Sequence, residues 1–385
     1  MANLFEHWSA TKEALTDGLT GNKKVVMESV LENTKRSLTE SATTGATMAG
    51  NIATLNKVIL PVIRRVMPTV IANELVGVQP MTGPVGQIHT LRVRYAETAA
   101  GVNAGQEALS PFAIAQGYSG NATTGKADAT STLEGAVGRK LNIQIVKQTV
   151  EAKSRKLSAR WTFESAQDAQ SMHGIDVEAE IMAALAQEIT TEIDQEILGS
   201  LSSLAGAASY TFDQGAVSGT ATFVGDEHAA LAVLINKAAN DIAARTRRGA
   251  GNWLVVSPSI LTVLQSATTS AFARTTEGAF EAPTNTKLVG TLNNTMKVYV
   301  NQYSTNDDVL VGYKGQSESD AAAFYCPYVP LMSTGTVLDP NTLEPVVGFM
   351  SRYGYVELSN TASSLGNAAD YLNKIAVTTG NLSFS

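Results

Sequence analysis

The most regular apolar pattern in the chain lies between residues 177 and 197. Large apolar side chains recur there at every fourth position, at Val177, Ile181, Leu185, Ile189, Ile193 and Ile197. Glutamates occupy the other faces, so the pattern predicts an amphipathic helix with one buried stripe. Asp176 is placed to cap its start and Gly199 to end it. Such a helix is roughly 30 Å long, at about 1.5 Å per residue.

A second helical pattern follows, and a buried strand comes after it. The shared helical face is made by Leu231, Leu234, Ile235, Ala238 and Ile242. Basic residues and Gly249 then suit a helix end. Residues 253–256 (WLVV) predict a strand, and residues 257–258 (SP) predict the cap and first residue of another helix. Residues 161–173 predict a separate short helix before Gly174.

Two segments alternate apolar and polar residues at the two-residue period of a strand. The apolar positions are Leu91, Val93 and Tyr95 in the first segment and Leu141, Ile143 and Ile145 in the second. The intervening stretch is rich in Ala, Gly, Ser and Thr, so we expect no core of its own there. The pattern predicts a long extended hairpin that must lean on another body, for which a partner subunit is the obvious candidate.

The remaining segments are shorter. The first fifty residues are polar, which is typical of an arm, and residues 41–50 resemble a linker. Residues 55–76 are apolar but contain Pro61 and Pro68, which favours short helical pieces, and residues 77–84 predict a fixed turn. Further strands are predicted at 298–300, 309–311 and 324–328, and two more around Arg352 within 346–358. Helices and strands do not alternate regularly, so the predicted fold class is α+β.

Composition narrows the class of protein. With 385 residues the chain exceeds the usual size of one hydrophobic core, so two lobes or more are expected. Only 16% of the residues are charged, which suits a surface that contacts other proteins. The formal charge of -7 disfavours strong DNA binding by the folded surface. Because Cys326 is the only cysteine, no intrachain disulfide can form. Without a signal peptide or a long apolar run, we expect neither secretion nor a membrane span.

One segment resembles a nucleotide-binding loop. Residues 120–126 (GNATTGK) match the phosphate-cradling pattern up to its lysine. The next residue is Ala127, however, so the hydroxyl that would hold magnesium is missing, and no buried strand precedes the first glycine. A flexible hairpin tip is the better interpretation.

The other reactive side chains also favour structural roles. The four histidines are His7, His89, His173 and His228, and no pair has metal-binding helical spacing. Acids occur at residues 226–227 and 307–308, where a helix start and a turn explain them. Cys326 has no local base and is expected to be a small buried hydrophobe. Arg245, Arg247 and Arg248 suit a helix C-terminus or a salt bridge between subunits. We therefore predict no catalytic, cofactor-binding or metal-binding residues and no enzyme activity.

Six segments in order resemble the major head proteins of T-even-like myoviruses, which belong to the Hong Kong 97-type capsid family. They are residues 77–88 (GVQPMTGPVGQI), 151–180 (EAKSRKLSARWTFESAQDAQSMHGIDVEAE), 248–258 (RGAGNWLVVSP), 298–303 (VYVNQY), 311–331 (VGYKGQSESDAAAFYCPYVPL) and 348–354 (GFMSRYG). Together they extend across roughly residues 55 to 355. Six ordered segments make this resemblance far more specific than any single short motif.

The resemblance implies a domain plan. Residues 1–87 would form an N-terminal arm with lead-in helices, and residues 88–147 an extended hairpin loop. Residues 148–207 and 325–385 would form a peripheral domain with a long spine helix, and residues 208–324 an axial domain.

Two departures limit the comparison. The hairpin is too short for the insertion domain of T-even head proteins, and Leu38-Thr39-Glu40 matches their protease site although processing at Glu40 is not assumed.

The function that the resemblance implies is mechanical. Copies would form hexamers and pentamers of an icosahedral head that encloses double-stranded DNA without reading its sequence. Portal, scaffolding and decoration proteins would be further partners, and assembly would take place in the host cytoplasm before the chain resides in the virion capsid. The alternative with the same architecture is an encapsulin-like compartment shell that encloses protein cargo.

Overall fold

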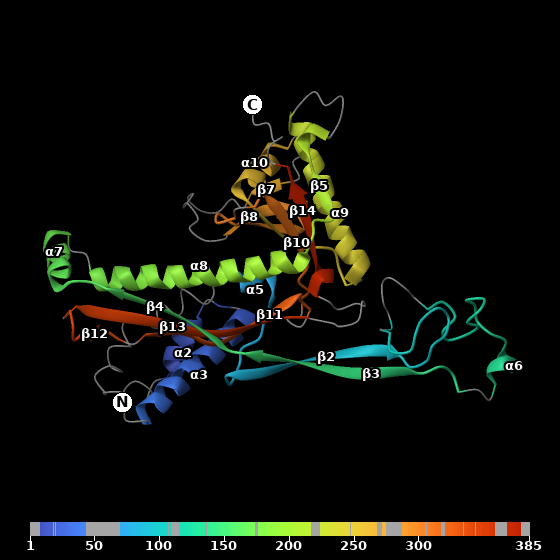
Figure 1. Cartoon of the computed structure of the whole chain (residues 1–385), viewed down its shortest axis with the longest axis horizontal. Coiled ribbons are helices and arrows are strands. Elements are labelled where there is room, and N and C mark those ends of the chain that lie inside the picture. Colours follow the sequence, from blue (N-terminus) through green and yellow to red (C-terminus); the bar gives the residue numbers. More distant parts are fainter. Residues whose placement is uncertain are drawn as a thin grey trace. The chain divides into compact units, whose positions relative to one another are not determined.

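Figure 1 shows a computed structural model of the chain, with helices and strands mixed as the α+β prediction requires. The structure describes residues 8–17, 19, 21–43, 70–106, 108, 115–134, 137–173, 176–216, 224–246, 248–267, 272–274, 287–304, 306–316, 320–333, 335–342, 344–358 and 368–378. The chain divides into two compact units. Unit 1 comprises residues 1–86, 150–200 and 324–356, and unit 2 comprises residues 87–149, 201–323 and 357–385.

Unit 1 is built on a five-stranded sheet of order β1–β11–β13–β12, with β4 also paired to β13. The strands are β1 (Gly77–Val78), β4 (Lys153–Arg160), β11 (Ala323–Ser333), β12 (Val337–Leu338) and β13 (Pro345–Glu357). β13 is one strand and not the two that we predicted. It pairs with β4 in unbroken antiparallel register from Val346 to Tyr353, so Arg352 lies within the ladder and does not interrupt it.

The long helix α8 (Val177–Ala205) is the one that the four-residue repeat predicts. The carboxylate of Asp176 caps it by accepting hydrogen bonds from the N–H groups of Glu178 and Ala179 at 3.1 and 3.4 Å. Gly199 does not end the helix, contrary to the prediction. An exposed helical glycine costs only about 1 kcal/mol, which is less than the roughly 2 kcal/mol gained by burying Leu201 beyond it.

Shorter helices complete unit 1. They are α2 (Trp8–Thr16), α3 (Asn22–Thr43), α5 (Ala72–Leu75) and α7 (Phe163–His173), the last of which was predicted. The predicted linker at 41–50 starts inside α3, and the rest of it lies outside the described residues. Pro61 and Pro68 also lie outside the described residues. In the part of the chain that the structure describes, no helix is both long and apolar enough to cross a membrane.

Unit 2 contains a seven-stranded sheet of order β5–β14–β10–β6–β9–β8–β7. The strands are β5 (Tyr210–Phe212), β6 (Trp253–Val256), β7 (Phe272–Arg274), β8 (Lys287–Leu292), β9 (Met296–Val300), β10 (Asp308–Gly312) and β14 (Leu372–Val377). The helical elements are η1 (Gln214–Ala216), α9 (Val224–Thr246), α10 (Pro258–Ser266) and η2 (Ala368–Tyr371). The core joins the predicted α9 stripe, with Leu231, Ile235 and Ile242 fully buried, to strands β6, β9 and β10. Ser257 caps α10 as predicted.

The last strand corrects the predicted domain plan, which put all of residues 325–385 with the long helix. β14 instead pairs antiparallel with β10 and parallel with β5, inside the sheet of unit 2. Its Ile375 is fully buried in the core of that unit, which explains the placement. The polar stretch before β14 carries no signal that would indicate the change of sheet.

The hairpin consists of β2 (Val85–Tyr95) and β3 (Leu141–Glu151), which form a sheet of their own, and the short helix α6 (Thr130–Leu133) lies in the loop between them. At one end the N–H of Ala152 donates to the carbonyl of Pro84 at 2.8 Å, and at the other the N–H of Ala96 donates to the carbonyl of Lys140 at 3.1 Å. These two bonds show that the strands run antiparallel along their whole length, as predicted.

Candidate assembly surface

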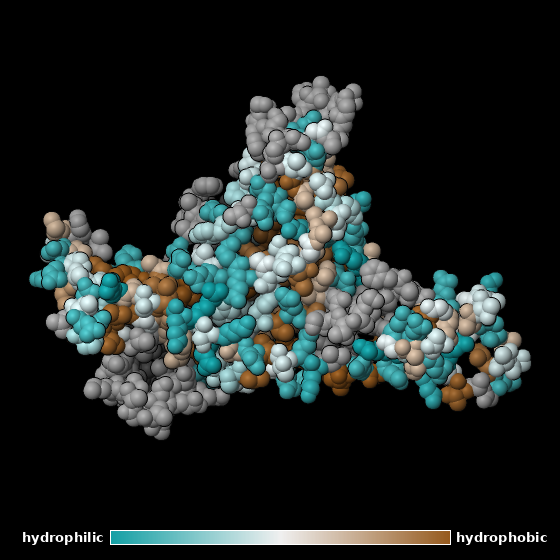
Figure 2. All heavy atoms as spheres, in the orientation of Figure 1, coloured by the Kyte–Doolittle hydropathy of each residue, from teal (hydrophilic) through white to brown (hydrophobic). Residues whose placement is uncertain are grey.

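The outer part of β3 leaves its apolar side chains uncovered. Leu141, Ile143 and Ile145 point to one face of the strand, and 53%, 68% and 66% of their surfaces are exposed. In Figure 2 apolar residues lie among polar ones over the hairpin. A two-stranded ribbon is marginal in water, and an uncovered apolar face makes it more so. The geometry therefore fits a surface that is completed by another molecule.

The loop beyond the ribbon has a small core, which corrects the expectation that it has none. Tyr95, Val102, Ala108, Ala115 and Tyr118 form a buried cluster there. The rings of Tyr95 and Tyr118 lie 4.6 Å apart at a tilt of 57°, and the Tyr118 hydroxyl donates to the carbonyl of Lys140 at 2.8 Å. The cluster joins residues that are far apart in sequence, so a local scan of apolar content misses it.

Arg139 holds the loop closed. Its Nη1 donates to the carbonyls of Gly117, Tyr118 and Gly120 at 3.1, 2.9 and 3.1 Å, and its guanidinium lies 5.8 Å from the centre of the Tyr118 ring. One side chain thus satisfies three carbonyls of a turn that has little other packing. The tip is a shaped element on the end of the ribbon.

The glycine-rich loop at residues 120–126 is a closed turn within this tip. The N–H of Asn121 donates to the carbonyl of Lys126 at 2.9 Å, and the N–H of Gly125 donates to the carbonyl of Asn121 at 3.0 Å. The Asn121 side chain accepts from the N–H groups of Thr123 and Thr124 at 2.9 and 3.1 Å. The amides that would cradle a phosphate are already bonded, so the loop does not have the form of a nucleotide site.

His228, Asp307, Asp308 and Cys326 are held by contacts within the chain. His228 is 1% exposed, with its Nδ1 2.5 Å from the Ser266 hydroxyl. Asp307 accepts from the Ser257 hydroxyl at 2.5 Å, and Asp308 forms an ion pair with Lys374 at 2.8 Å. Cys326 is buried, and this burial raises the pKa of its thiol to about 12. Among the described residues, no group of three His, Cys, Asp or Glu side chains is arranged to hold a metal ion.

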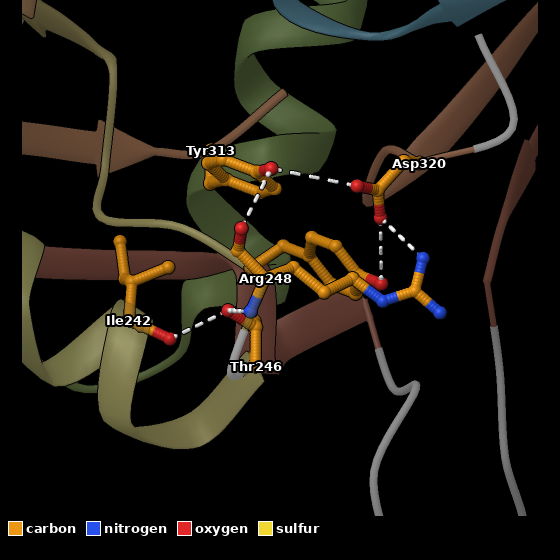
Figure 3. Close-up of polar contacts among 6 residues, drawn as sticks. Ile242, Thr246, Arg248, Tyr313 and Asp320 are labelled. Atoms are coloured by element: carbon orange, nitrogen blue, oxygen red, sulfur yellow. Dashed lines mark hydrogen bonds and ion pairs between the residues drawn. The ribbon is translucent and has the colours of Figure 1, made fainter. Parts of the chain in front are cut away.

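The arginines after α9 differ in their contacts. Arg245 bonds the carbonyl of Asp241 in the last turn, and Arg247 lies outside the described residues. Nη1 of Arg248 lies 2.7 Å from Oδ1 of Asp320 (Figure 3), and the hydroxyls of Tyr313 and Tyr371 also donate to this carboxylate. Arg248 therefore forms its ion pair within the chain. The cluster fixes the end of α9 to the segment that precedes β11.

The N-terminal helix α3, in the segment that we predicted to be an arm, packs within unit 1. Val26, Met27, Val30 and Leu31 of α3 are at most 3% exposed. Nδ2 of Asn33 donates to the carbonyls of Met81 and Tyr328 at 2.7 and 3.1 Å. Residues 26–33 of α3 thus contribute to the core of their own chain.

Strand β4 is joined to α8 by charged groups that the sequence did not single out. Arg155 lies 2.7 Å from Glu192 and 2.5 Å from Glu196, and its Nε donates to the Tyr353 hydroxyl at 2.6 Å. Partial burial opposes the charge, but the hydrogen bonds with Glu196 and Tyr353 prevail and raise the pKa of Arg155. The sequence pattern indicated that the glutamates of α8 form a solvated face. Glu192 and Glu196 instead pair with Arg155.

Comparison with known proteins gives one family. Residues 52–135 and 104–377 match the family described as major capsid protein Gp23. The major capsid protein of Vibrio phage KVP40 is 30% identical, over 86% of this chain and 82% of the relative, and that of Enterobacteria phage T4 is 29% identical, over 80% and 76%. A solved chain of Mycobacterium phage Bobi is 14% identical with a TM-score of 0.49, over 80% of this chain and 89% of that one.

Proposed function

The chain belongs to the Gp23 family of major capsid proteins, and from this we propose that its copies form hexamers and pentamers that tile an icosahedral head around double-stranded DNA. The predicted resemblance to T-even-like head proteins and the function as a major capsid protein of a tailed phage are confirmed by the family match and the relatives. The family favours a phage head over an encapsulin-like compartment.

The exposed face of β3 carries this proposal. Leu141, Ile143 and Ile145 need a cover that the described part of their own chain does not supply. A second copy that receives this face by a different surface makes a heterologous contact, and such contacts form rings when the rotation between copies closes. A subunit held by several neighbours gains avidity, so a shell of modest contacts persists when one contact breaks.

The domain plan and the partners follow as parts of the same proposal. Unit 1 with α8 would take the peripheral position and the seven-stranded sheet the axial position, with β14 added to the latter. The head would form in the host cytoplasm with portal, scaffolding and decoration proteins. The chain would act by assembly and not by catalysis, as the family of major capsid proteins suggests. Its formal charge of -7 suits a wall that does not grip the packaged DNA.

The test changes the exposed face without touching the core. The double variant Ile143→Asp with Ile145→Asp should keep the melting temperature of the free subunit, because both side chains are largely exposed there, and should form no shells. The control Asn142→Asp with Gln144→Glu adds the same charge to the other face of the strand and should assemble. Electron microscopy and sedimentation velocity measure shell formation by both variants. Shells at the wild-type level from the isoleucine variant would refute the role of this face.

A further inference from the structure

Asp194 is a carboxylic acid in the buried stripe of α8. Asp194 is 1% exposed. In the sequence it lies between Ile193 and Ile197, which are 2% and 1% exposed. Its Oδ1 accepts a hydrogen bond from the backbone N–H of Ile71 at 2.9 Å. Its Oδ2 is buried and has no hydrogen-bond partner among the described residues. One acid thus joins α8 to a segment more than a hundred positions away in sequence.

The groups around Asp194 do not neutralise it. On β11, Tyr325 lies near Asp194, and burial raises the pKa of its hydroxyl, so it remains uncharged. On α5, Glu74 forms an ion pair with Lys23 at 2.5 Å. On α8 itself, Glu196 is bonded to Arg155. No cation among the described residues is paired with Asp194, so the hydrogen bond from Ile71 compensates only part of the cost of burying the ionised form.

The segment that Asp194 holds is well placed to transmit a change. Val70, Ile71, Ala72 and Leu75 are at most 3% exposed, and this stretch leads directly into β1. Asn22 and Lys23 at the start of α3 bond to Val78 and Glu74. Loosening residues 70–76 would therefore loosen the docking of the N-terminal helices as well.

We propose that Asp194 is a proton-controlled latch, which holds residues 70–76 against α8 when the carboxyl is neutral and weakens that hold when the carboxyl ionises. Burial raises the pKa of Asp194 to about 7, and the hydrogen bond from Ile71 opposes this only in part. An asparagine would keep the bond to Ile71 without an ionisable group. What the acid adds is sensitivity to pH near neutrality.

Hydrogen exchange of the full chain, measured by mass spectrometry at pH 5.5 and 8.5, tests the latch. After correction for intrinsic exchange rates, the protection of residues 70–76 should fall by about 30-fold at the higher pH, the ratio for a pKa near 7 in the closed state and near 4 in the open state. Residues 231–242 of α9 lie in the unit of His228, which is destabilised only at the lower pH, so their protection should not fall at the higher pH.

Two variants complete the test. Asp194→Asn should remove the pH dependence of residues 70–76, and Glu188→Gln, an exposed change on the same helix, should keep it. Protection of residues 70–76 that does not depend on pH in the wild-type chain would overturn the proposal. So would an Asp194→Asn variant with the pH dependence of the wild type. The wild-type result decides the matter even where the variant fails to fold.

Discussion

At the scale of single residues, two buried ionisable groups respond to pH in opposite directions. Unit 1 is more stable when Asp194 is neutral, which is the case at low pH. Unit 2 is more stable when His228 is neutral, which is the case at high pH. Burial lowers the pKa of His228, although the nearby Glu227 partly opposes this effect. Neither group stands out in the sequence, because burial of one polar side chain depends on segments that only the fold brings together.

The pH dependence of unit 2 follows from the sign of the His228 shift. Below the ordinary pKa of about 6.5 the unfolded chain takes up a proton that the folded chain resists, so the free energy of unfolding falls as the pH drops below that value. His228→Asn keeps a polar atom near Ser266 and removes the titration. We expect its melting temperature to lose less between pH 7.5 and 5.5 than that of the wild type. An equal loss in both chains would contradict this account.

Gly312 shows how tightly the sheet of unit 2 is packed. A Cβ atom at this position would lie 2.0 Å from the Trp253 ring, so Gly312→Ala must displace a fully packed indole. Overpacking of this kind costs about 1–3 kcal/mol. Thermal unfolding should show the loss, whereas Gly138→Ala, where nothing lies within 4 Å, should change little. A Gly312→Ala chain as stable as the wild type would mean that Trp253 moves freely.

At the scale of elements, the docking of α3 depends on the side-chain amide of Asn33. Asn33→Ala removes two hydrogen bonds and leaves the carbonyls of Met81 and Tyr328 without this donor, at a cost of about 2 kcal/mol. Ser29→Ala removes only an exposed bond within the same helix and is the matched control. Urea unfolding measures both. If the two variants lost equal stability, the docking of α3 would not rest on Asn33.

The elements also show where sequence patterns suffice. The apolar stripe of α8 and the alternation of β2 and β3 are local, so periodicity found all three. β4 escaped notice because its sequence, KSRKLSAR, is charged, and only pairing with β13 and the bonds of Arg155 to α8 make it a strand. The tip cluster of Tyr118 and Arg139 was also not predicted, because it depends on contacts between residues that are not neighbours in the sequence. Contacts across long separations decide these elements, and one sequence does not reveal them.

At the scale of the whole molecule, each unit closes its own core, and the ribbon with its apolar face is left for a partner. The sequence predicted the hairpin and its need for support, which is the central part of the candidate surface. It did not predict that α3 packs on its own chain, because Val26 and Val30 indicate a helical face but not the body against which that face docks. The covering surface on the second copy depends on assembly, so it has no signature within one chain.

Electron cryomicroscopy of particles formed by the purified full-length chain, with scaffolding and portal proteins added where the chain alone stays monomeric, tests the central claim most directly. We predict closed shells of sixfold and fivefold capsomers in which a neighbouring copy covers Leu141, Ile143 and Ile145. Monomers of 40.5 kDa that persist under all these conditions, or shells in which this face of β3 points into solvent, would contradict the account.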